Sequence, residues 1–207
     1  EDKMLFPRMG DYTQNRGRLY KQWMGLNPDQ PLPAGRPNQI DNISFFLRYQ
    51  LNWMYFRYFM WNFAGRQNGE QGYYPWDKSS GHWLSGIKFI DEARLHDQDN
   101  LPSAFKEDKA RNKYYMLPFL FGIIGLIFHL NRRRNDFLGL LALFVITGIG
   151  IIIYSNQPPN EPRERDYVLV GSFFTYAIWI GMATLAIFEL FRKIGRASCR
   201  ERVCHRV

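Results

Sequence analysis

The stretch that decides the fold is Val168-Leu-Val-Gly-Ser-Phe-Phe-Thr-Tyr-Ala-Ile-Trp-Ile-Gly-Met-Ala-Thr-Leu-Ala-Ile-Phe-Glu-Leu-Phe191. Its single charged side chain, Glu189, stands close to its end. A helix rises about 1.5 Å per residue, so about 20 apolar residues cross a bilayer core about 30 Å thick. The stretch therefore predicts a membrane-spanning helix over residues 168–191.

Two further stretches, 114–130 and 137–154, contain no Lys, Arg, Asp or Glu. The averages describe a soluble domain, with 46% hydrophobic residues and a mean hydropathy of −0.36. Yet among 27 Lys and Arg and 19 Asp and Glu residues, only Glu189 falls in the three stretches. That segregation excludes a simple soluble globule and a disordered chain. We therefore predict an all-α, polytopic membrane protein fragment with about three transmembrane helices, at 114–130, 137–154 and 168–191.

Charge in the connecting loops sets the expected topology. Three consecutive arginines, 132–134, lie in the short loop 131–136, and the positive-inside rule places such a loop in the cytoplasm. The loop 155–167 then faces outward. Residues 1–113 are expected to form an extracytoplasmic loop and interfacial-helix region, although four basic residues at 106–113 weigh against that side.

Two features of the last span predict how it packs. Ala177 and Gly181 are four residues apart and share one helical face, where another helix could approach closely. Glu189 is followed three and four residues later by Arg192 and Lys193. We expect the carboxylate to pair locally with these two cations.

Both ends of the chain look foreign to this fold. It begins Glu1-Asp2-Lys3, and we interpret it as an internal piece of a longer protein. Ile-Gly-Arg-Ala-Ser-Cys-Arg-Glu-Arg-Val-Cys at 194–204 resembles a translated sequencing adapter, so 194–207 is interpreted as an artefactual tail; the alternative is a basic cytoplasmic tail. Both cysteines lie there, so no disulfide or thiolate site is predicted. Without the tail, 132–134 is the main basic block, and nucleic-acid binding is not expected.

The polar region changes character after a Pro- and Gly-rich linker at 25–38. Residues 43–64 contain neither Gly nor Pro, and ten of the nineteen residues at 45–63 are aromatic. Polar side chains such as Gln50 and Arg57 interrupt the run, so a fourth span is not predicted. An aromatic helix lying in the membrane interface fits this pattern, and so does a helix packed onto the rest of the protein.

Four aromatic residues follow among polar ones: Tyr73, Tyr74, Trp76 and Trp83. Aromatic faces beside polar side chains can bind sugars, because a pyranose ring has an apolar face and a rim of hydroxyls. Anchoring in the membrane interface explains the same composition.

An acidic group comes next: Asp91, Glu92, His96, Asp97 and Asp99. Such a group could ligate a divalent cation. It is more often solvated surface, so no metal is assigned and the cofactor is left open.

The outward loop carries the most informative motif, at 157–167. Three prolines stiffen it, and charges of alternating sign follow them. Arg163 and Arg165 could present guanidinium groups to a phosphate near the lipid headgroups. The acidic residues between and beside them could orient the arginines, hold a metal or act as a base. The alternative is a knot of salt bridges that closes the loop over the spans.

Several of these blocks resemble one family. The string Gln157-Pro-Pro-Asn-Glu-Pro-Arg-Glu-Arg-Asp-Tyr167, followed by Val-Gly-Ser-Phe-Phe and Ala-Ile-Trp-Ile-Gly, resembles the hallmark of a bacterial multi-span family formerly catalogued as a domain of unknown function. That family is similar to a eukaryotic protein O-mannosyltransferase and is placed with the GT-C glycosyltransferases. Residues 49–67 and Asn112-Lys113-Tyr114-Tyr115 also resemble it, so the resemblance runs from roughly residue 40 to residue 191.

The resemblance implies an enzyme of the bacterial inner membrane. It would transfer a mannose-like sugar from a polyprenyl-phosphate donor to a protein acceptor outside the cytoplasm. The family motif supplies candidates for contact with the donor phosphate: Arg163, Arg165, Asp166 and Tyr167. The second motif supplies candidates for lining the same cavity: Arg66 and Gln67. The family's acidic catalytic residue lies in the first extracytoplasmic loop, before this chain begins, so no catalytic residue is assigned and the piece alone is expected to be inactive.

Three other classes compete with this interpretation. A nonenzymatic assembly or export scaffold would use Arg163 and Arg165 for structure only. A transporter or flippase for a lipid-linked sugar needs a polar pathway through the spans, which carry almost no charge. A soluble nucleic-acid binder depends on the suspect tail for its basic signal.

Overall fold

The protein is described from a computed structural model. Its described residues are 5–10, 16–160 and 166–204; side chains are described up to residue 195, except that of Asp166. Helix accounts for 62% of the residues and strand for 3%. The all-α class expected from the sequence is therefore confirmed.

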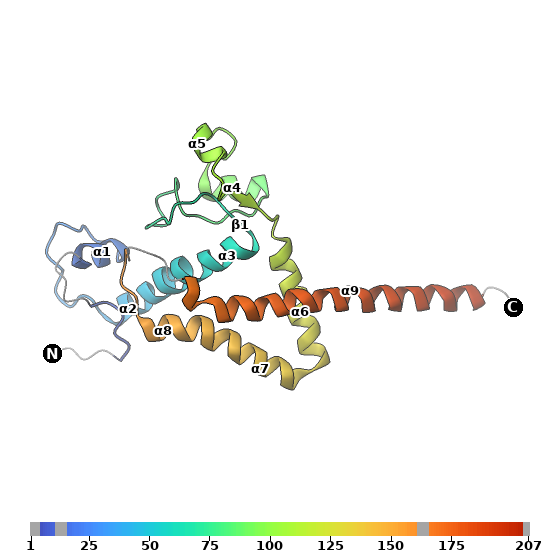
Figure 1. The fold of residues 1–207 in the computed structure, drawn as a ribbon. Coiled ribbons are helices and arrows are strands. Elements are labelled where there is room, and N and C mark those ends of the chain that lie inside the picture. The colour runs from blue at the N-terminus through green and yellow to red at the C-terminus, as the bar shows by residue number, and fades with distance from the viewer. Residues whose placement is uncertain (1–4, 11–15, 161–165, 205–207) are drawn as a thin grey trace.

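One continuous helix organises the first half of the chain. It consists of α2 (Gln39–Phe45), a π-helical segment η1 (Phe46–Phe56) and α3 (Arg57–Phe63), and it follows the short helix α1 (Arg16–Trp23) (Figure 1). A capping box begins it, because the Asn38 side chain accepts from the Asp41 amide and the Asp41 carboxylate accepts from the Asn38 amide, both at 2.9 Å.

The aromatic helix packs into the core. Phe59 and Phe63 both lie 4.7 Å, between ring centroids, from Tyr176 of the last helix. The same cluster contains Phe137 and Trp179. The helix is thus packed onto the rest of the protein, although its outer face exposes apolar side chains: Ile40, Ile43, Leu47 and Phe56.

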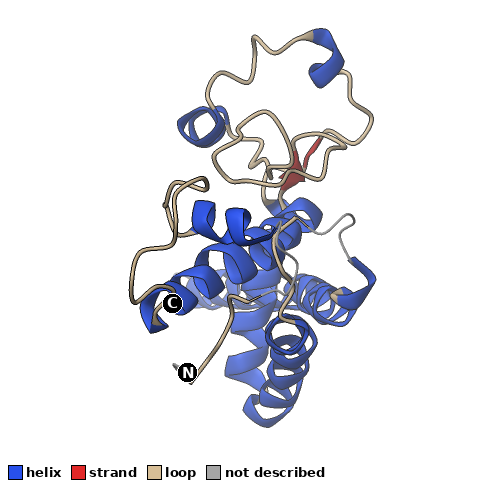
Figure 2. Cartoon of the chain, turned by 90° about the vertical axis from the view of Figure 1, so that its left-hand side faces the viewer, coloured by secondary structure: helices blue, strands red, loops and turns tan. Residues whose placement is uncertain are grey.

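A loop-rich segment at 65–113 stands above the helices (Figure 2). Strands β1 (Gly65–Arg66) and β2 (Asn112–Lys113) pair antiparallel at its base, and α4 (Lys88–Leu95) and α5 (Ser103–Lys106) are its helices. Gly65 has φ +153°, and a Cβ there would lie 2.7 Å from the Asn112 carbonyl oxygen. The close contact between β1 and β2 at this position therefore requires glycine.

Buried Arg57 ties this segment to the helix beneath it. Its guanidinium donates to the carbonyls of Gln71 (2.7 Å) and Gly81 (2.8 Å). The guanidinium also lies 4.4 Å from the ring centroids of both Trp53 and Trp61, so it is held between two indoles.

The second half of the chain consists of long apolar helices. They are α6 (Leu117–Arg132), then α7 (Arg134–Val145), η2 (Ile146–Gly150) and α8 (Ile151–Ser155) as one run, and, after the 3-10 turn η3 (Asp166–Val168), α9 (Val170–Cys204).

Two of the three expected spans have the length and composition to cross a membrane. They are Arg134–Ser155 and Val170–Gly195, whose most apolar windows are only 17% and 22% buried, unlike core helices of soluble proteins. The third, α6, has 16 residues and is about 24 Å long, which is short of a bilayer core. The described chain thus has two helices that could span a membrane, and the expectation of about three spans is not confirmed.

Helix α6 crosses α9 at two glycines. A Cβ on Gly125 would lie 1.7 Å from the Trp179 carbonyl oxygen, and one on Gly122 would lie 2.2 Å from the Tyr176 ring. Trp179 Nε1 donates to His129 Nδ1 at 3.3 Å beside this crossing. At Gly181, where the sequence predicts that a helix could approach, no other helix of the described chain lies within 4 Å of an added Cβ.

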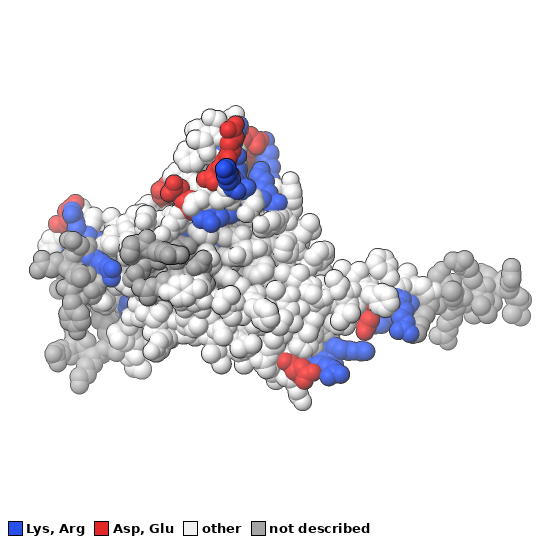
Figure 3. Space-filling view, viewed as in Figure 1, with Lys and Arg blue, Asp and Glu red and all other residues white. Residues whose placement is uncertain are grey.

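Charged side chains gather on segment 65–113 and at the far end of the long helices, with an uncharged surface between them (Figure 3). At that far end Glu189 pairs with Arg132 of α6, at 3.6 Å. The expectation that it pairs with Arg192 and Lys193 on its own helix is wrong for the described chain. The carboxylate instead joins two helices.

Candidate functional site

The Pro-rich loop after α8 is held by buried side chains of η1. Gln50 Nε2 donates to Asn156 Oδ1 at 2.9 Å and to the Gln157 carbonyl at 3.3 Å. Tyr49 donates its hydroxyl to the Pro158 carbonyl at 2.9 Å. The Gln50 side chain is fully buried. Two neighbouring residues of one helix thus fix the start of the loop that carries the arginine motif.

The N-terminal segment reinforces this anchor. Arg8 donates to the Ile153 carbonyl at 2.7 Å and to Asn156 Oδ1 at 3.4 Å, while its backbone amide donates to Asn42 Oδ1 at 2.7 Å. Asn156 adopts the left-handed conformation that Asn tolerates, with φ 41°, where α8 ends. Its side chain is therefore an acceptor shared by two distant parts of the chain.

An aromatic wall borders the loop on the side of segment 65–113. Tyr74 and Trp76 stack at 4.8 Å between ring centroids with an interplanar angle of 16°, and Trp76 contacts Trp23 at 5.3 Å. Asn160 Nδ2 donates to the Tyr74 hydroxyl at 2.7 Å. Trp76 remains 47% exposed, so the wall offers an aromatic face beside polar groups. Such a face can accept a sugar ring.

Trp83 has a different role from the aromatic residues of the wall. The Arg94 guanidinium lies 3.5 Å from its ring centroid and donates to its carbonyl at 3.2 Å. The guanidinium therefore occupies one face of the indole. Of the four predicted sugar-binding aromatics, Tyr74 and Trp76 are the pair that the structure brings together next to the loop.

Several buried polar atoms near the loop, Arg8 Nε among them, have no hydrogen-bond partner within the described chain. The others are Gln50 Oε1, Trp23 Nε1 and Asn160 Oδ1. A buried polar atom without a partner costs about 1–3 kcal/mol. The residues that carry these atoms hold the loop or contact the aromatic wall.

The arginine motif itself is only partly described. Arg163 and Arg165 lie outside the described residues. Asp166 and Tyr167 open the turn η3 that leads into α9, and Tyr167 is 68% exposed. Leu169, just after the turn, packs with Tyr55 and Ile152 in a buried cluster. The motif is thus framed by Asn160 on one side and by the buried start of α9 on the other.

The two residues of the second motif organise segment 65–113. Arg66 lies 4.1 Å from the Trp61 ring centroid and donates to the Gly69 carbonyl at 3.0 Å. Gln67 is buried, and it donates to the Lys78 carbonyl at 2.9 Å and accepts from the His82 amide at 3.1 Å. The nitrogen and the oxygen of the Gln67 side-chain amide therefore both form hydrogen bonds with the backbone of the loop.

His82 is buried beside this network. Its Nε2 lies 2.7 Å from the Asp77 carbonyl, and its ring meets Trp53 edge-on at 5.0 Å. Burial, together with the nearby cations Lys78, Arg94 and Arg57, lowers the pKa of His82 to about 4, against the opposing effect of the Asp77 carbonyl. At neutral pH the imidazole is uncharged and donates from Nε2.

Part of the acidic group forms a compact cluster. Carboxylate oxygens of Glu92, Asp97 and Asp99 lie within 4.8 Å of one another. Lys88 Nζ lies 2.6 Å from Asp99 and 3.6 Å from Glu92, and its hydrogen bond to Asp99 raises the pKa of the lysine. Asp91 points elsewhere, accepting from the Ser85 and Gly86 amides. The Lys88 ammonium offsets part of the negative charge of these three carboxylates.

The sequence did not single out the residues that anchor the loop. Tyr49 and Gln50 are the first residues of the stretch 49–67, yet only the fold shows that they bind the loop at 157–167. The available signal is Gln50 itself, because a polar residue on the buried face of an aromatic helix must find a partner.

Comparison with known proteins covers a small part of the chain. The model of a family of unknown function (DUF8416) matches residues 1–47. That match ends inside η1, ahead of Tyr49 and of the loop after α8. No curated protein and no solved structure matches the chain.

Replacing Gln50 by Leu is expected to loosen the loop. The substitution removes both donations from Nε2, which costs about 1 kcal/mol and raises the rate of limited trypsin cleavage at Arg163 or Arg165 roughly fivefold. Mass spectrometry of the cleaved ends measures that rate. Gln30→Leu, at an exposed position, is the control and leaves it unchanged. Equal cleavage in the two variants would show that Gln50 does not hold the loop.

Proposed function

We propose that this chain is part of a GT-C-type glycosyltransferase of the bacterial inner membrane, which transfers a mannose-like sugar from a polyprenyl phosphate to a protein acceptor. The observation that carries the proposal is the anchored loop ahead of Arg163. It stands between two helices long and apolar enough to span a membrane, and buried Tyr49 and Gln50 fix its start. The resemblance of residues 157–167 to the family hallmark adds the chemistry.

The transfer needs a group that stabilises the leaving phosphate. The acceptor hydroxyl oxygen attacks the anomeric carbon as the bond from that carbon to the phosphate oxygen breaks. Negative charge then grows on the polyprenyl phosphate, and the guanidinium groups of Arg163 and Arg165 stabilise it. The acceptor proton passes to an acidic base, which we assign to no residue of this chain. A cofactor or metal is not assigned either.

The aromatic wall provides a place for the sugar in this scheme. Tyr74 and Trp76 form a stacked pair, and Asn160 connects the pair to the loop. A pyranose ring stacked on Trp76 lies next to the start of the arginine motif. This arrangement favours a donor whose sugar and phosphate are held by adjacent parts of one site.

The proposed topology places this site outside the cytoplasm. The loop after α8 and the turn between α6 and α7 lie at opposite ends of the α7–α8 run (Figure 1). The turn carries Arg132, Arg133 and Arg134, and such basic loops remain inside. Residues 155–167 then face the side where a membrane glycosyltransferase meets a translocated protein.

The test is sugar transfer by the complete protein that contains this chain. Membranes bearing wild-type protein, Arg163→Ala or Arg165→Ala are given radiolabelled polyprenyl-phosphate mannose and an acceptor protein. Loss of one charge-assisted contact of about 1.5–3 kcal/mol lowers the transfer rate about 10-fold to 150-fold. Arg134→Ala, at the opposite end of the helices, is the matched control and keeps the wild-type rate.

A nonenzymatic scaffold is the second candidate, and one observation favours it. The start of the loop is built into the protein, because Gln157, Pro158 and Asn160 form hydrogen bonds with Gln50, Tyr49 and Tyr74. If the arginines also serve structure only, Arg163→Ala and Arg165→Ala lower the amount of protein in the membrane. No sugar transfer by wild-type protein, with reduced abundance of both variants, would replace the enzyme with the scaffold.

A further inference from the structure

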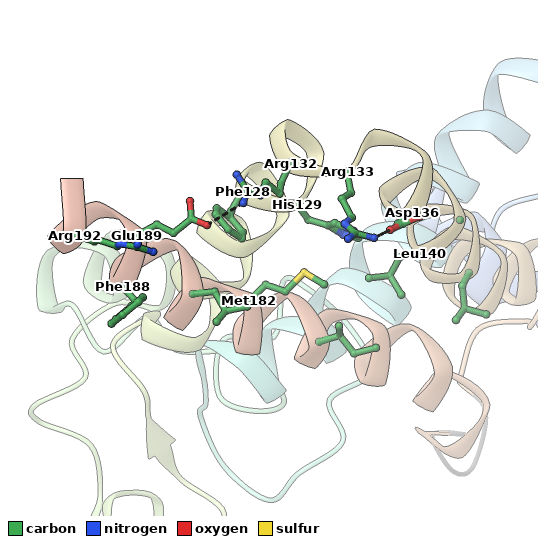
Figure 4. Close-up of a pocket in the computed structure, with 14 residues that line it drawn as sticks. Phe128, His129, Arg132, Arg133, Asp136, Leu140, Met182, Phe188, Glu189 and Arg192 are labelled. Atoms are coloured by element: carbon green, nitrogen blue, oxygen red, sulfur yellow. Dashed lines mark hydrogen bonds and ion pairs between the residues drawn. The ribbon is translucent and has the colours of Figure 1, made fainter.

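A groove of about 730 Å³ lies between α6, α7 and α9, beside the turn that joins α6 to α7 (Figure 4). It lies at the other end of the α7–α8 run from the loop of the proposed glycosyltransferase site. Its volume falls in the range of about 300–1,000 Å³ that is typical of ligand sites.

The groove has an apolar interior. Leu140 and Leu143 of α7 line it together with Met182 and Phe188 of α9. Leu143 and Phe188 are 47% and 66% exposed, so the described chain leaves these side chains uncovered. An interior of this kind fits a hydrocarbon chain.

The rim of the groove is charged, and its carboxylates are already paired. Arg132 pairs with Glu189 at 3.6 Å, and Arg133 pairs with Asp136 at 3.3 Å. Arg192 also lines the groove, and no carboxylate of the described chain forms an ion pair with it. The rim therefore has one arginine more than it has acidic partners.

Two further cations add to this excess. Arg134 lines an adjoining hollow of about 420 Å³ with Arg133 and Asp136, and Lys193 lines another of about 270 Å³ with Arg132 and Glu189. Once the two pairs cancel, three positive charges remain around the rim: Arg134, Arg192 and Lys193. The groove combines an apolar interior with a cationic mouth.

We propose that this groove binds an anionic phospholipid, with one acyl chain along the apolar interior and the phosphate at Arg192. Basic pockets between membrane helices bind anionic headgroups in this way. A packed helix would cover the apolar interior but would leave the excess of positive charge uncompensated. The inference does not depend on the proposed glycosyltransferase activity.

Native mass spectrometry of the full chain in dodecyl maltoside tests the proposal. Dioleoyl phosphatidylglycerol is expected to bind about tenfold more tightly than dioleoyl phosphatidylcholine. Arg192→Gln is expected to weaken phosphatidylglycerol binding about fivefold, which corresponds to about 1 kcal/mol for one cation near a lipid surface. Lys106→Gln, an exposed cation on α5, is the control and leaves binding unchanged.

A second variant separates groove binding from general attraction to charge. Leu143→Trp fills the groove from α7 with an exposed side chain and keeps all the arginines, so phosphatidylglycerol binding is expected to be lost. Unchanged binding in Leu143→Trp, or equal binding of the two phospholipids, would overturn the proposal. Tighter binding of polyprenyl phosphate than of phosphatidylglycerol would also overturn it, because the preferred occupant would then be a polyprenyl lipid and not a phospholipid.

Discussion

Gly125→Ala is expected to unfold the contact between α6 and α9. The new methyl carbon would lie 1.7 Å from the Trp179 carbonyl oxygen, an atom of the helix backbone that cannot rotate away. The helices must therefore separate, and overpacking of this kind costs about 3 kcal/mol or more. Since many proteins are stable by about 5–15 kcal/mol, one methyl group removes a large part of the margin.

Thermal unfolding in detergent, followed by circular dichroism, measures this effect. Gly181→Ala is the matched control, because it lies on α9 and has open space around it. That control is expected to keep or slightly raise the unfolding temperature, since Ala favours helix by about 1 kcal/mol over Gly. Gly122→Ala should fall between the two, because it meets the movable ring of Tyr176. Equal unfolding temperatures for Gly125→Ala and Gly181→Ala would refute the crossing.

The glycines show that the sequence predicts a small face on a helix but not the helix that packs against it. The four-residue spacing of Ala177 and Gly181 correctly indicates one small face of α9, but not whether another helix lies against it. In the structure the crossing brings Gly122 and Gly125 of α6 against Tyr176, Trp179 and the backbone of Ala183 on α9, and Gly181 has open space around it. The partner surface depends on the crossing of two helices, which a one-dimensional pattern does not contain.

The distribution of charges along the sequence predicts where the long helices lie, but it does not predict which residues form ion pairs. Charge-free runs locate the long helices but not all their ends: α6 begins after Tyr115 and Met116, which have positive φ and form a turn, and α9 continues past its run to Cys204. Glu189 forms an ion pair with Arg132 of α6 rather than with a cation of its own helix. From the sequence only neighbours three and four residues apart are visible, so the pair between helices could not be predicted.

The candidate site, too, is only partly predictable from the sequence. The loop at 157–167 stands out from its prolines and alternating charges, and these features require no fold. Its anchors, Gln50 and Tyr74, come from an aromatic helix and from a polar loop far away in the chain. Hydrogen bonds over such separations are set by the packing of the aromatic helix against α8 and α9, which only the fold supplies.

The second large effect is a loss of stability in segment 65–113 as the pH falls from 7 to 5. His82 has a folded pKa of about 4 and an ordinary unfolded value near 6.5, so between these values the unfolded chain binds the proton and the folded chain does not. Stability is therefore complete above pH 6.5 and decreases as the pH falls toward 4. Linkage gives a loss of about 2 kcal/mol at pH 5.

Hydrogen exchange of two backbone amides reports this loss directly. The Gln67 amide donates to the His82 carbonyl and the Leu84 amide to the Gly65 carbonyl, both at 2.9 Å, so both bonds open when the segment unfolds. After correction for the intrinsic pH dependence of exchange, their protection is expected to fall about 30-fold between pH 7 and pH 5.

His82→Gln separates titration from packing. The glutamine amide still donates to the Asp77 carbonyl but carries no titrating group, so the fall in protection below pH 6.5 is expected to disappear. His96→Gln removes an exposed histidine of the same segment and is expected to keep the wild-type profile. The acidic groups of this segment whose pKa is lowered, Asp77 among them, lose their contribution at a pH below that of His82. A wild-type profile in His82→Gln would therefore show that another group, and not the buried imidazole, controls the stability of this segment.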